Sequence, residues 1–147
     1  MTQKNGAPRQ LGVGVVGIGR MGRHHAMNVL HQVPRAKLVC ACSPAESDLV
    51  WAAQHLVPHG VTVVPTFEEM IGIPGLDAII IASATDLHYS QTTTALEKGL
   101  HVLCEKPVCR TLVEVSNAMA STSAAALSAN LKNSWKHWSK RLKPILA

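Results

Sequence analysis

The sequence has few aromatic residues and no long apolar run, and each shortage excludes a class of protein. Aromatics make up 3 % of the 147 residues, so aliphatic side chains must form the core, as in buried parallel strands covered by helices. No apolar run approaches the ~18 residues of a membrane span, and residues 1–10 show no apolar stretch of the signal-peptide type. We therefore expect a cytoplasmic protein with no membrane span.

Acidic residues are absent after Glu114, and this absence explains the net charge of +5. Residues 1–129 hold nine acids and nine lysines and arginines, so that part of the chain is neutral. The excess lies near the end, in Lys132, Lys136, Lys140, Arg141 and Lys143. The body of the protein is thus not a basic domain of the nucleic-acid-binding type, and we expect no nucleic-acid partner.

The four cysteines form no C-x-x-C pair and have no histidine at zinc-finger spacing. Cys40 and Cys42 alternate with small residues in an expected strand, which indicates reduced, buried thiols. His55 and His59 are four residues apart, but Pro58 breaks the helix that would align them. The sequence therefore predicts no metal site.

Strand-like and helix-like segments alternate along the chain. This alternation predicts an α/β fold, a three-layer Rossmann-like parallel sheet with helices on both faces. The expected strands are 11–16, 36–42, 61–64, 77–82 and 101–104, and the expected helices are 19–32, 44–56, 67–71, 86–98 and 111–127. We expect a disordered leader over 1–10, one α/β domain over 11–127 and a basic amphipathic tail over 128–147; the motifs described below predict that the domain over 11–127 binds a dinucleotide.

Three expected helix starts carry an S/T-x-x-E pattern, in which the hydroxyl and the carboxylate cap free backbone N–H groups. The pairs are Ser43 with Glu46, Thr66 with Glu69, and Thr111 with Glu114. At the first of them, Pro44 would occupy the first helical position. These patterns support the predicted boundaries.

A G-x-G-x-x-G pattern follows the first strand and opens the first helix. In this context it predicts a turn that cradles the pyrophosphate of a dinucleotide, with free N–H groups at the helix N-terminus. The first glycine permits the tight turn, the second lets the pyrophosphate approach, and the third lets the helix pack closely. The candidate cofactor-binding residues are Gly17, Ile18, Gly19, Arg20, Met21 and Gly22.

The acid that usually binds the ribose hydroxyls at the end of the second strand is missing, and Ser43 stands there. A neutral residue removes the repulsion that an acid would exert on a 2′-phosphate. The cofactor is therefore NAD or NADP, with a slight preference for NADP. Arg20 and Arg23 are candidate phosphate ligands, and the alternative for Ser43 is a helix cap.

Three segments together resemble the glucose–fructose oxidoreductase/inositol dehydrogenase (Gfo/Idh/MocA) family. They are V-V-G-I-G-R-M-G-R-H-H-A over 15–26, A-S-A-T-D-L-H over 82–88 and G-L-H-V-L-C-E-K-P-V over 99–108. The resemblance covers roughly residues 11–126. It implies an NAD(P)-binding Rossmann domain of an oxidoreductase that acts on CH–OH groups of a sugar, polyol or related compound.

The resemblance also implies roles for individual residues. Lys106 of the E-K-P motif is the expected catalytic residue, which lies by the nicotinamide and helps proton movement, with Glu105 beside it. The loop after the fourth strand is expected along the cofactor, which adds Ser83, Thr85 and His88 to the candidate cofactor-binding residues. The alternatives are that Thr85 or Asp86 caps the next helix and that His88 is an exposed first-turn residue.

The family continues into a substrate domain that has no counterpart here, and much of the family's oligomer interface is missing with it. We therefore expect a truncated chain that is not catalytic alone. The alternative is a nonenzymatic nucleotide-binding regulatory protein. A third reading is a binding module that acts through its tail, where Leu131, Trp135, Trp138 and Leu142 share one helical face. That face would bind an anionic membrane or a partner protein. The alternatives are that it covers apolar surface left open by the missing substrate domain, or that the tail is disordered.

Overall fold

The computed structural model describes residues 9–111, 113, 114, 116 and 117. The chain divides into two units, residues 1–110 and 111–147. The predicted leader, apart from residues 9 and 10, and the predicted tail lie outside the described residues. The first unit contains all the strands of the described part and the whole candidate site.

The predicted alternation of strands and helices is confirmed within the first unit, with ends that differ by two residues at most. The strands are β1 (Leu11–Val16), β2 (Ala36–Cys42), β3 (Thr62–Val64), β4 (Ala78–Ile81) and β5 (His101–Cys104). The helices are α1 (Arg20–Gln32), α2 (Glu46–His55), the 3-10 turn Val57–His59, α3 (Phe67–Met70) and α4 (Thr85–Glu97). None of the helices in the described residues combines the length and apolar character needed to cross a membrane.

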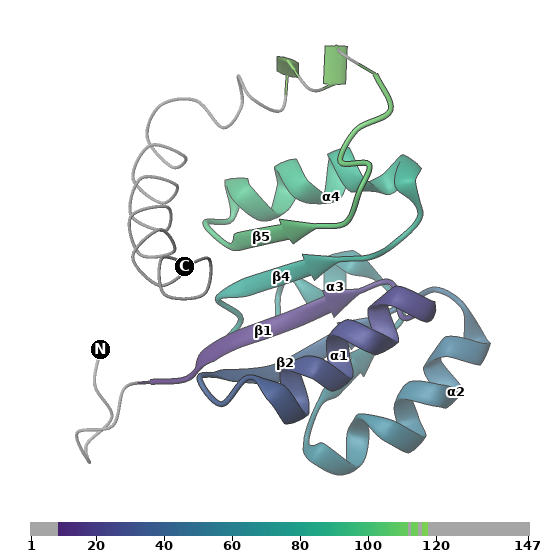
Figure 1. The fold of residues 1–147 in the computed structure, drawn as a ribbon, viewed down its shortest axis with the longest axis vertical. Coiled ribbons are helices and arrows are strands. Elements are labelled where there is room, and N and C mark those ends of the chain that lie inside the picture. Colours follow the sequence, from purple (N-terminus) through teal and green to yellow (C-terminus); the bar gives the residue numbers. More distant parts are fainter. Residues whose placement is uncertain (1–8, 112, 115, 118–147) are drawn as a thin grey trace, which may run out of the picture. The chain divides into compact units, whose positions relative to one another are not determined.

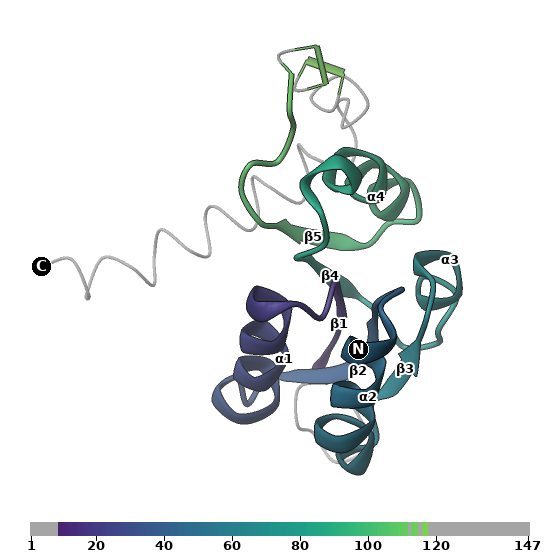
Figure 2. The same ribbon diagram turned by 90° about the vertical axis from the view of Figure 1, so that its right-hand side faces the viewer.

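The strands form one parallel sheet in the order β3-β2-β1-β4-β5 (Figure 1). Helices cover both of its faces, as the alternation predicts (Figure 2). On one face, Ala26 and Val29 of α1 and Ala52 of α2 pack with Val15 of β1. On the other, Met70 of α3 and Ala95 of α4 pack with side chains of β2 and β4. Burial of β1, β2 and β4 on both faces explains their runs of Val, Ile, Ala and Cys.

The strand order reverses direction beside β1, because β1 pairs with both β2 and β4. The register places Val16 opposite Cys42 on one side and Ile81 on the other. Backbone hydrogen bonds continue past the strand ends, from Gly17 N to Cys42 O at 2.8 Å and from Ala82 N to Val16 O at 2.8 Å. The carboxyl ends of three central strands therefore meet at a topological switch point, where ligands bind in open α/β sheets.

Two of the three predicted helix caps are present. Thr66 accepts a hydrogen bond from the Glu69 N–H at the start of α3. In the second unit, the Thr111 hydroxyl accepts from Glu114 N at 3.2 Å, and the Glu114 carboxylate accepts from Thr111 N at 3.1 Å. Most of the helix predicted over 111–127 lies outside the described residues.

The predicted cap at Ser43 is wrong. Helix α2 begins at Glu46 with Ala45 as its N-cap, and no side chain caps it. Pro44 lies before the helix rather than at its first position. The Ser43 hydroxyl instead accepts a long 3.3 Å hydrogen bond from Ala45 N and donates to Asp48, so it belongs to the loop rather than to the cap.

Truncation of a fully buried strand residue tests the role of the central sheet. Ile79→Ala should lower the free energy of unfolding by about 2–5 kcal/mol, because Ile79 is fully buried between the sheet and its covering helices. Ile79→Val should cost about 0.5–1.5 kcal/mol and serves if the alanine variant does not fold. Urea denaturation followed by circular dichroism measures both.

The matched control for this test is Val50→Ala on the outer side of α2. Val50 is 53 % exposed, so its truncation should change the free energy of unfolding by no more than about 0.5 kcal/mol. Equal losses at Ile79 and Val50 would contradict the assignment of β4 to the buried centre of the sheet.

Candidate functional site

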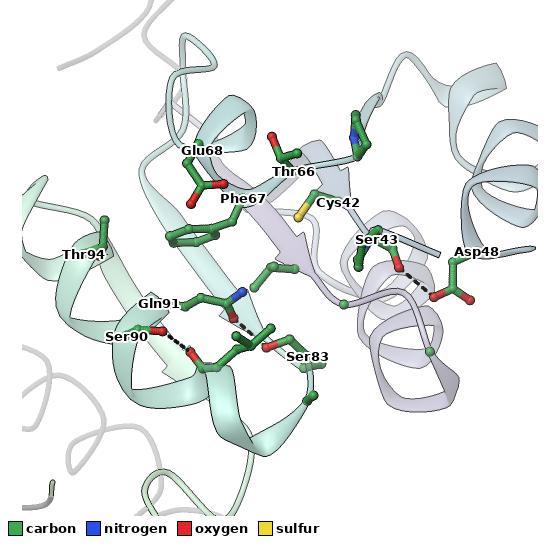
Figure 3. Close-up of a pocket in the computed structure, with 18 residues that line it drawn as sticks. Cys42, Ser43, Asp48, Thr66, Phe67, Glu68, Ser83, Ser90, Gln91 and Thr94 are labelled. Atoms are coloured by element: carbon green, nitrogen blue, oxygen red, sulfur yellow. Dashed lines mark hydrogen bonds between the residues drawn. The ribbon is translucent and has the colours of Figure 1, made fainter. Parts of the chain in front are cut away.

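A cavity of about 700 Å³ lies at the carboxyl edge of the sheet (Figure 3). Its walls come from the carboxyl ends of β1 and β2, from the loops that follow the first four strands, and from helices α2, α3 and α4. The lining residues are Val16, Gly17, Gly19, Cys42, Ser43, Pro44, Asp48, Pro65, Thr66, Phe67, Glu68, Ala82, Ser83, Ala84, Leu87, Ser90, Gln91 and Thr94. The cavity thus occupies the switch point that the strand order defines.

The glycine turn at the end of β1 is built tightly. Gly17 adopts a φ of +83°, which favours glycine, and a Cβ there would press against Ala82 and Ser83. A Cβ at Gly22 would overlap the carbonyl oxygen of Gly17, so only glycine allows α1 to start this close to the turn. These two positions meet the packing requirements expected of the first and third glycines of the pattern.

Gly19 differs from the other two glycines, because a Cβ there would meet no atom of the described residues within 4 Å. Packing within the chain therefore gives no reason for glycine at this position. Gly19 lines the cavity and is the N-cap of α1, whose first turn contains no acid. Open space, free backbone N–H groups and the positive end of a helix suit the pyrophosphate of a dinucleotide.

The cavity takes in some of the sequence-predicted cofactor residues and leaves others outside. Those that line it are Gly17, Gly19, Ser43 and Ser83. Those that do not line it are Ile18, Arg20, Met21, Gly22, Thr85, His88, Glu105 and Lys106. Ile18 is fully buried in the core cluster that α1 covers, so its side chain anchors the glycine turn to the core and does not reach the cavity. Arg20 and Met21 are exposed at the start of α1.

A neutral thiol at the end of β2 and a carboxylate from α2 both line the cavity. Burial raises the pKa of the Cys42 thiol to about 12, so this lining residue carries no charge at neutral pH. The Ser43 hydroxyl donates a 2.8 Å hydrogen bond to Oδ2 of Asp48, which reaches in from α2. A carboxylate therefore lies beside Ser43 although the strand itself ends without one.

The loop after β4 is held by side chains of α4. The Ser83 hydroxyl donates a 2.6 Å hydrogen bond to Oε1 of Gln91 (Figure 3). His88 is 2 % exposed, and its Nδ1 and Nε2 lie 2.8 Å from Pro107 O and 3.0 Å from Ser83 O. The interpretation of His88 as an exposed first-turn residue is therefore wrong. Its geometry joins the loop after β4 to the turn after β5 and offers no ring nitrogen to a cofactor.

The alternative that Thr85 or Asp86 caps α4 is also wrong. The N-cap is Ala84, with no side-chain hydrogen bond, and Thr85 is already the first helical residue. Asp86 lies in the first turn, where its carboxylate pairs with Arg110 at 3.0 Å. An acid in this position also interacts favourably with the helix dipole.

The E-K-P turn follows β5 and is tied to α1. Nε2 of His25 lies 2.6 Å from Oε1 of Glu105, and this hydrogen bond is the main cause that holds the pKa of Glu105 below its ordinary value. The Glu105 N–H continues the sheet by donating to Ile81 O at 2.9 Å. Lys106 is exposed. The turn therefore has a fixed carboxylate and, next to it, an ammonium group open to a ligand.

Most of the lining residues escaped the sequence-based prediction, and three of them matter most for the chemistry of the cavity: Phe67, Gln91 and Asp48. Phe67 follows β3, and its position just after a strand of a parallel sheet was the available signal. Gln91 and Asp48 lie within helices, where only the rotation of the helix brings them to the cavity. His25, which entered the sequence-based prediction only as part of the 15–26 segment, is half-buried against Glu105.

Comparisons with known proteins agree with this geometry. The sequence profile of the Gfo/Idh/MocA oxidoreductase family, NAD-binding Rossmann fold, matches residues 11–129. The chain is 35 % identical over 105 residues to the scyllo-inositol 2-dehydrogenase (NAD(+)) of Bacillus subtilis, an alignment that covers 71 % of this chain and 30 % of that one. With the 1,5-anhydro-D-fructose reductase of Ensifer adhaerens, the identity is 26 % over 132 residues, which cover 87 % and 39 %.

Among solved structures, the fold is similar to scyllo-inositol dehydrogenase from Lactobacillus casei with bound cofactor NAD(H) and scyllo-inositol. The TM-score is 0.72 at 31 % identity, over 78 % of this chain and 33 % of that one. The chain thus spans only 30 to 39 % of the length of these relatives. The family profile matches residues 11–129, and the parallel sheet and the glycine turn agree with it. The chain therefore belongs to the Gfo/Idh/MocA oxidoreductase family and carries its NAD-binding Rossmann fold.

Proposed function

We propose that this chain binds NAD(H) or NADP(H) in the cavity at the carboxyl edge of the sheet and serves an oxidoreductase that acts on CH–OH groups. The observation that carries the proposal is the bare Gly19 at the start of α1, which opens into the cavity although nothing in the chain requires a glycine there. A pyrophosphate would fill this space and accept hydrogen bonds from the N–H groups of the first turn.

The rest of the lining suits the two ends of such a ligand. Phe67 and Pro65, after β3, offer an apolar wall for the adenine ring of the cofactor. Ser43 and Asp48 would contact the ribose that is attached to this adenine. Ser83, fixed by Gln91, lies beside the glycine turn. The bound cofactor would supply the nicotinamide that accepts or gives a hydride.

Lys106 is the residue that we propose to assist catalysis. Oxidation of a hydroxyl carbon releases a hydride to the cofactor and a proton from the oxygen. A lysine close to the hydroxyl would take that proton in its neutral amine form, and its ammonium form would return a proton to the oxygen in the reverse reduction. Lys106 is exposed at a turn whose neighbour Glu105 is bonded to His25, so its backbone position is fixed while its side chain is free to reach a substrate.

The substrate class follows from the relatives rather than from this chain's own residues. Two of them act on inositol or on an anhydro sugar, according to their names, which supports a polyol or sugar hydroxyl as the reacting group. The residues that would choose among such substrates correspond to parts of the relatives that this chain does not span, so catalysis requires groups beyond the cofactor site.

The choice between NAD and NADP depends on the end of β2. The uncharged Ser43 at this position supports NADP when it is taken alone. Cys40 and Cys42 are buried thiols outside any disulfide, which suits the cytoplasm that we propose as the compartment.

A thermal melt with and without dinucleotide tests the proposal. Saturating NAD(H) or NADP(H) should stabilise the chain by about 2.7 kcal/mol at a hundredfold excess over the dissociation constant, an increase of several degrees in Tm. Gly19→Asp should abolish this increase, because it places a carboxylate where the pyrophosphate lies. Differential scanning fluorimetry measures both effects.

The same variant carries its own control for folding. Asp is a favoured N-cap residue, so Gly19→Asp should keep or raise the Tm of the ligand-free chain. Gly19→Ala adds a Cβ without charge and should weaken the ligand-induced increase without abolishing it. A cooperative melt that neither dinucleotide shifts would overturn the proposed function, and a shift that survives Gly19→Asp would displace the site from the glycine turn.

The link between Glu105 and His25 gives a prediction for pH dependence. Because the pKa of Glu105 is lowered in the folded state, the ionised carboxylate stabilises the fold above about pH 4.3, and this contribution is lost as the pH falls through the lowered value. Glu105→Gln should therefore be less stable than the unmodified chain at pH 6, and the difference should shrink below pH ~4. Urea denaturation at a series of pH values measures it.

The control for Glu105 is Glu97→Gln, which changes an exposed carboxylate at the end of α4. Its effect on stability should be small and should show no comparable dependence on pH. If Glu105→Gln and Glu97→Gln behaved alike across the series, the bond to His25 would not anchor the E-K-P turn.

A further inference from the structure

The sequence has no acidic residue at the end of β2, but the fold brings a carboxylate from α2 next to this strand end. In dinucleotide-binding folds of this type, an acid at this strand end binds the 2′-hydroxyl of the adenosine ribose. Here the strand ends at Cys42 and is followed by the buried Ser43. The carboxylate of Asp48, in the first turn of α2, lies 2.8 Å from the Ser43 hydroxyl and lines the same cavity (Figure 3).

The Asp48 carboxylate is fixed by donors on both of its oxygens. Ser43 Oγ donates to Oδ2, and Nη2 of Arg23 donates to Oδ1 at 2.9 Å. Arg23 is itself held, because its Nε donates to Ile18 O at 3.0 Å and its guanidinium lies 4.9 Å from the centre of the Trp51 ring. This network connects the glycine turn, α1 and α2, so the position of the carboxylate is determined by the fold.

The carboxylate remains available to a ligand. The Asp48 side chain is 17 % exposed and contributes to the cavity wall. Each carboxylate oxygen can accept two hydrogen bonds, and the structure uses one on each. A ribose hydroxyl that enters the cavity beside Pro44 can therefore donate to Asp48, while Ser43 keeps its own bond.

Among the described residues that line the cavity, none is a lysine, arginine or histidine that could pair with a 2′-phosphate, and Arg20 lies outside the lining. Asp48 would repel such a phosphate, since two negative groups a few ångströms apart in a partly buried site repel each other more strongly than an ordinary hydrogen bond attracts. Arg23 is the nearest cation described in this network, but it is engaged with Asp48 and Ile18. Its transfer to a phosphate would leave the carboxylate half-buried without its ion pair.

From this geometry we infer that Asp48 is the specificity-determining residue of the cofactor site: it binds the ribose 2′-hydroxyl and selects NAD(H) against NADP(H). The inference rests on the proposed dinucleotide binding and deepens it. It also reverses the slight preference for NADP that Ser43 alone suggests, because the charge missing from the strand end is supplied from the next helix.

Dissociation constants for NAD⁺ and NADP⁺, measured by isothermal titration calorimetry on the full chain, test this inference. The unmodified chain should bind NAD⁺ at least about tenfold more tightly than NADP⁺. Asp48→Asn keeps the size and an acceptor for Ser43 but removes the charge and releases Arg23. It should tighten NADP⁺ binding by about tenfold or more, weaken NAD⁺ binding by a few-fold, and so narrow or invert the ratio.

Two further variants separate charge from structure. Asp48→Glu keeps the carboxylate and should preserve the preference for NAD⁺, which provides a test if the asparagine variant does not fold. Asp86→Asn removes an exposed carboxylate on α4, outside the cavity lining, and should leave the ratio unchanged. Loss of the preference in Asp86→Asn as well would show that general charge, not Asp48, discriminates between the cofactors.

The outcomes distinguish this inference from the proposed function. Tight binding of both dinucleotides without discrimination, a preference for NADP⁺, or an unchanged ratio in Asp48→Asn would overturn the role of Asp48 and leave dinucleotide binding in place. Absence of binding of either dinucleotide to the unmodified chain would overturn both.

Discussion

The close contact between Gly22 and the carbonyl of Gly17 determines where α1 begins, and the site depends on that position. Any side chain at Gly22 would push α1 away from the end of β1. At its actual distance, α1 presents its first turn to the cavity and buries Ala26 and Val29 on the sheet. The same contact thus serves packing and ligand binding, which is why glycine is required there for reasons internal to the chain.

From this fixed start, α1 supports the cofactor site in two directions. Arg23 reaches across to Asp48 beyond the end of β2, and His25 reaches across to Glu105 beyond the end of β5. Both residues lie within two turns of the helix start. The loop after β2 and the E-K-P turn, which are far apart in sequence, are therefore positioned by two side chains of a single helix.

The sequence was sufficient for features that depend on local chemistry. Alternating strand and helix patterns predicted the sheet, and spacing alone predicted the glycine turn and the cap at Thr66. The cap expected at Ser43 failed, because Ala45 stays extended and α2 starts later, which turns the hydroxyl toward Asp48.

Features that depend on tertiary contacts could not be predicted from the sequence. The burial of His88 depends on the turn after β5 folding back over α4, so that Pro107 O meets its ring. The place of Asp48 depends on the rotation of α2 about its axis and on the salt bridge to Arg23. Neither the spacing nor the composition of the chain determines such contacts.

The dual anchoring by α1 has a consequence for the motion of the site. Segments that share their anchoring contacts open together as one cooperative unit rather than one by one. If α1 detaches from the sheet, the glycine turn loses its helix, Asp48 loses Arg23 and Glu105 loses His25 in the same event. In the ligand-free chain the glycine turn, the ion pair of Asp48 and the anchor of the E-K-P turn should thus be lost and regained together, while the loop after β4 keeps its hydrogen bonds to α4.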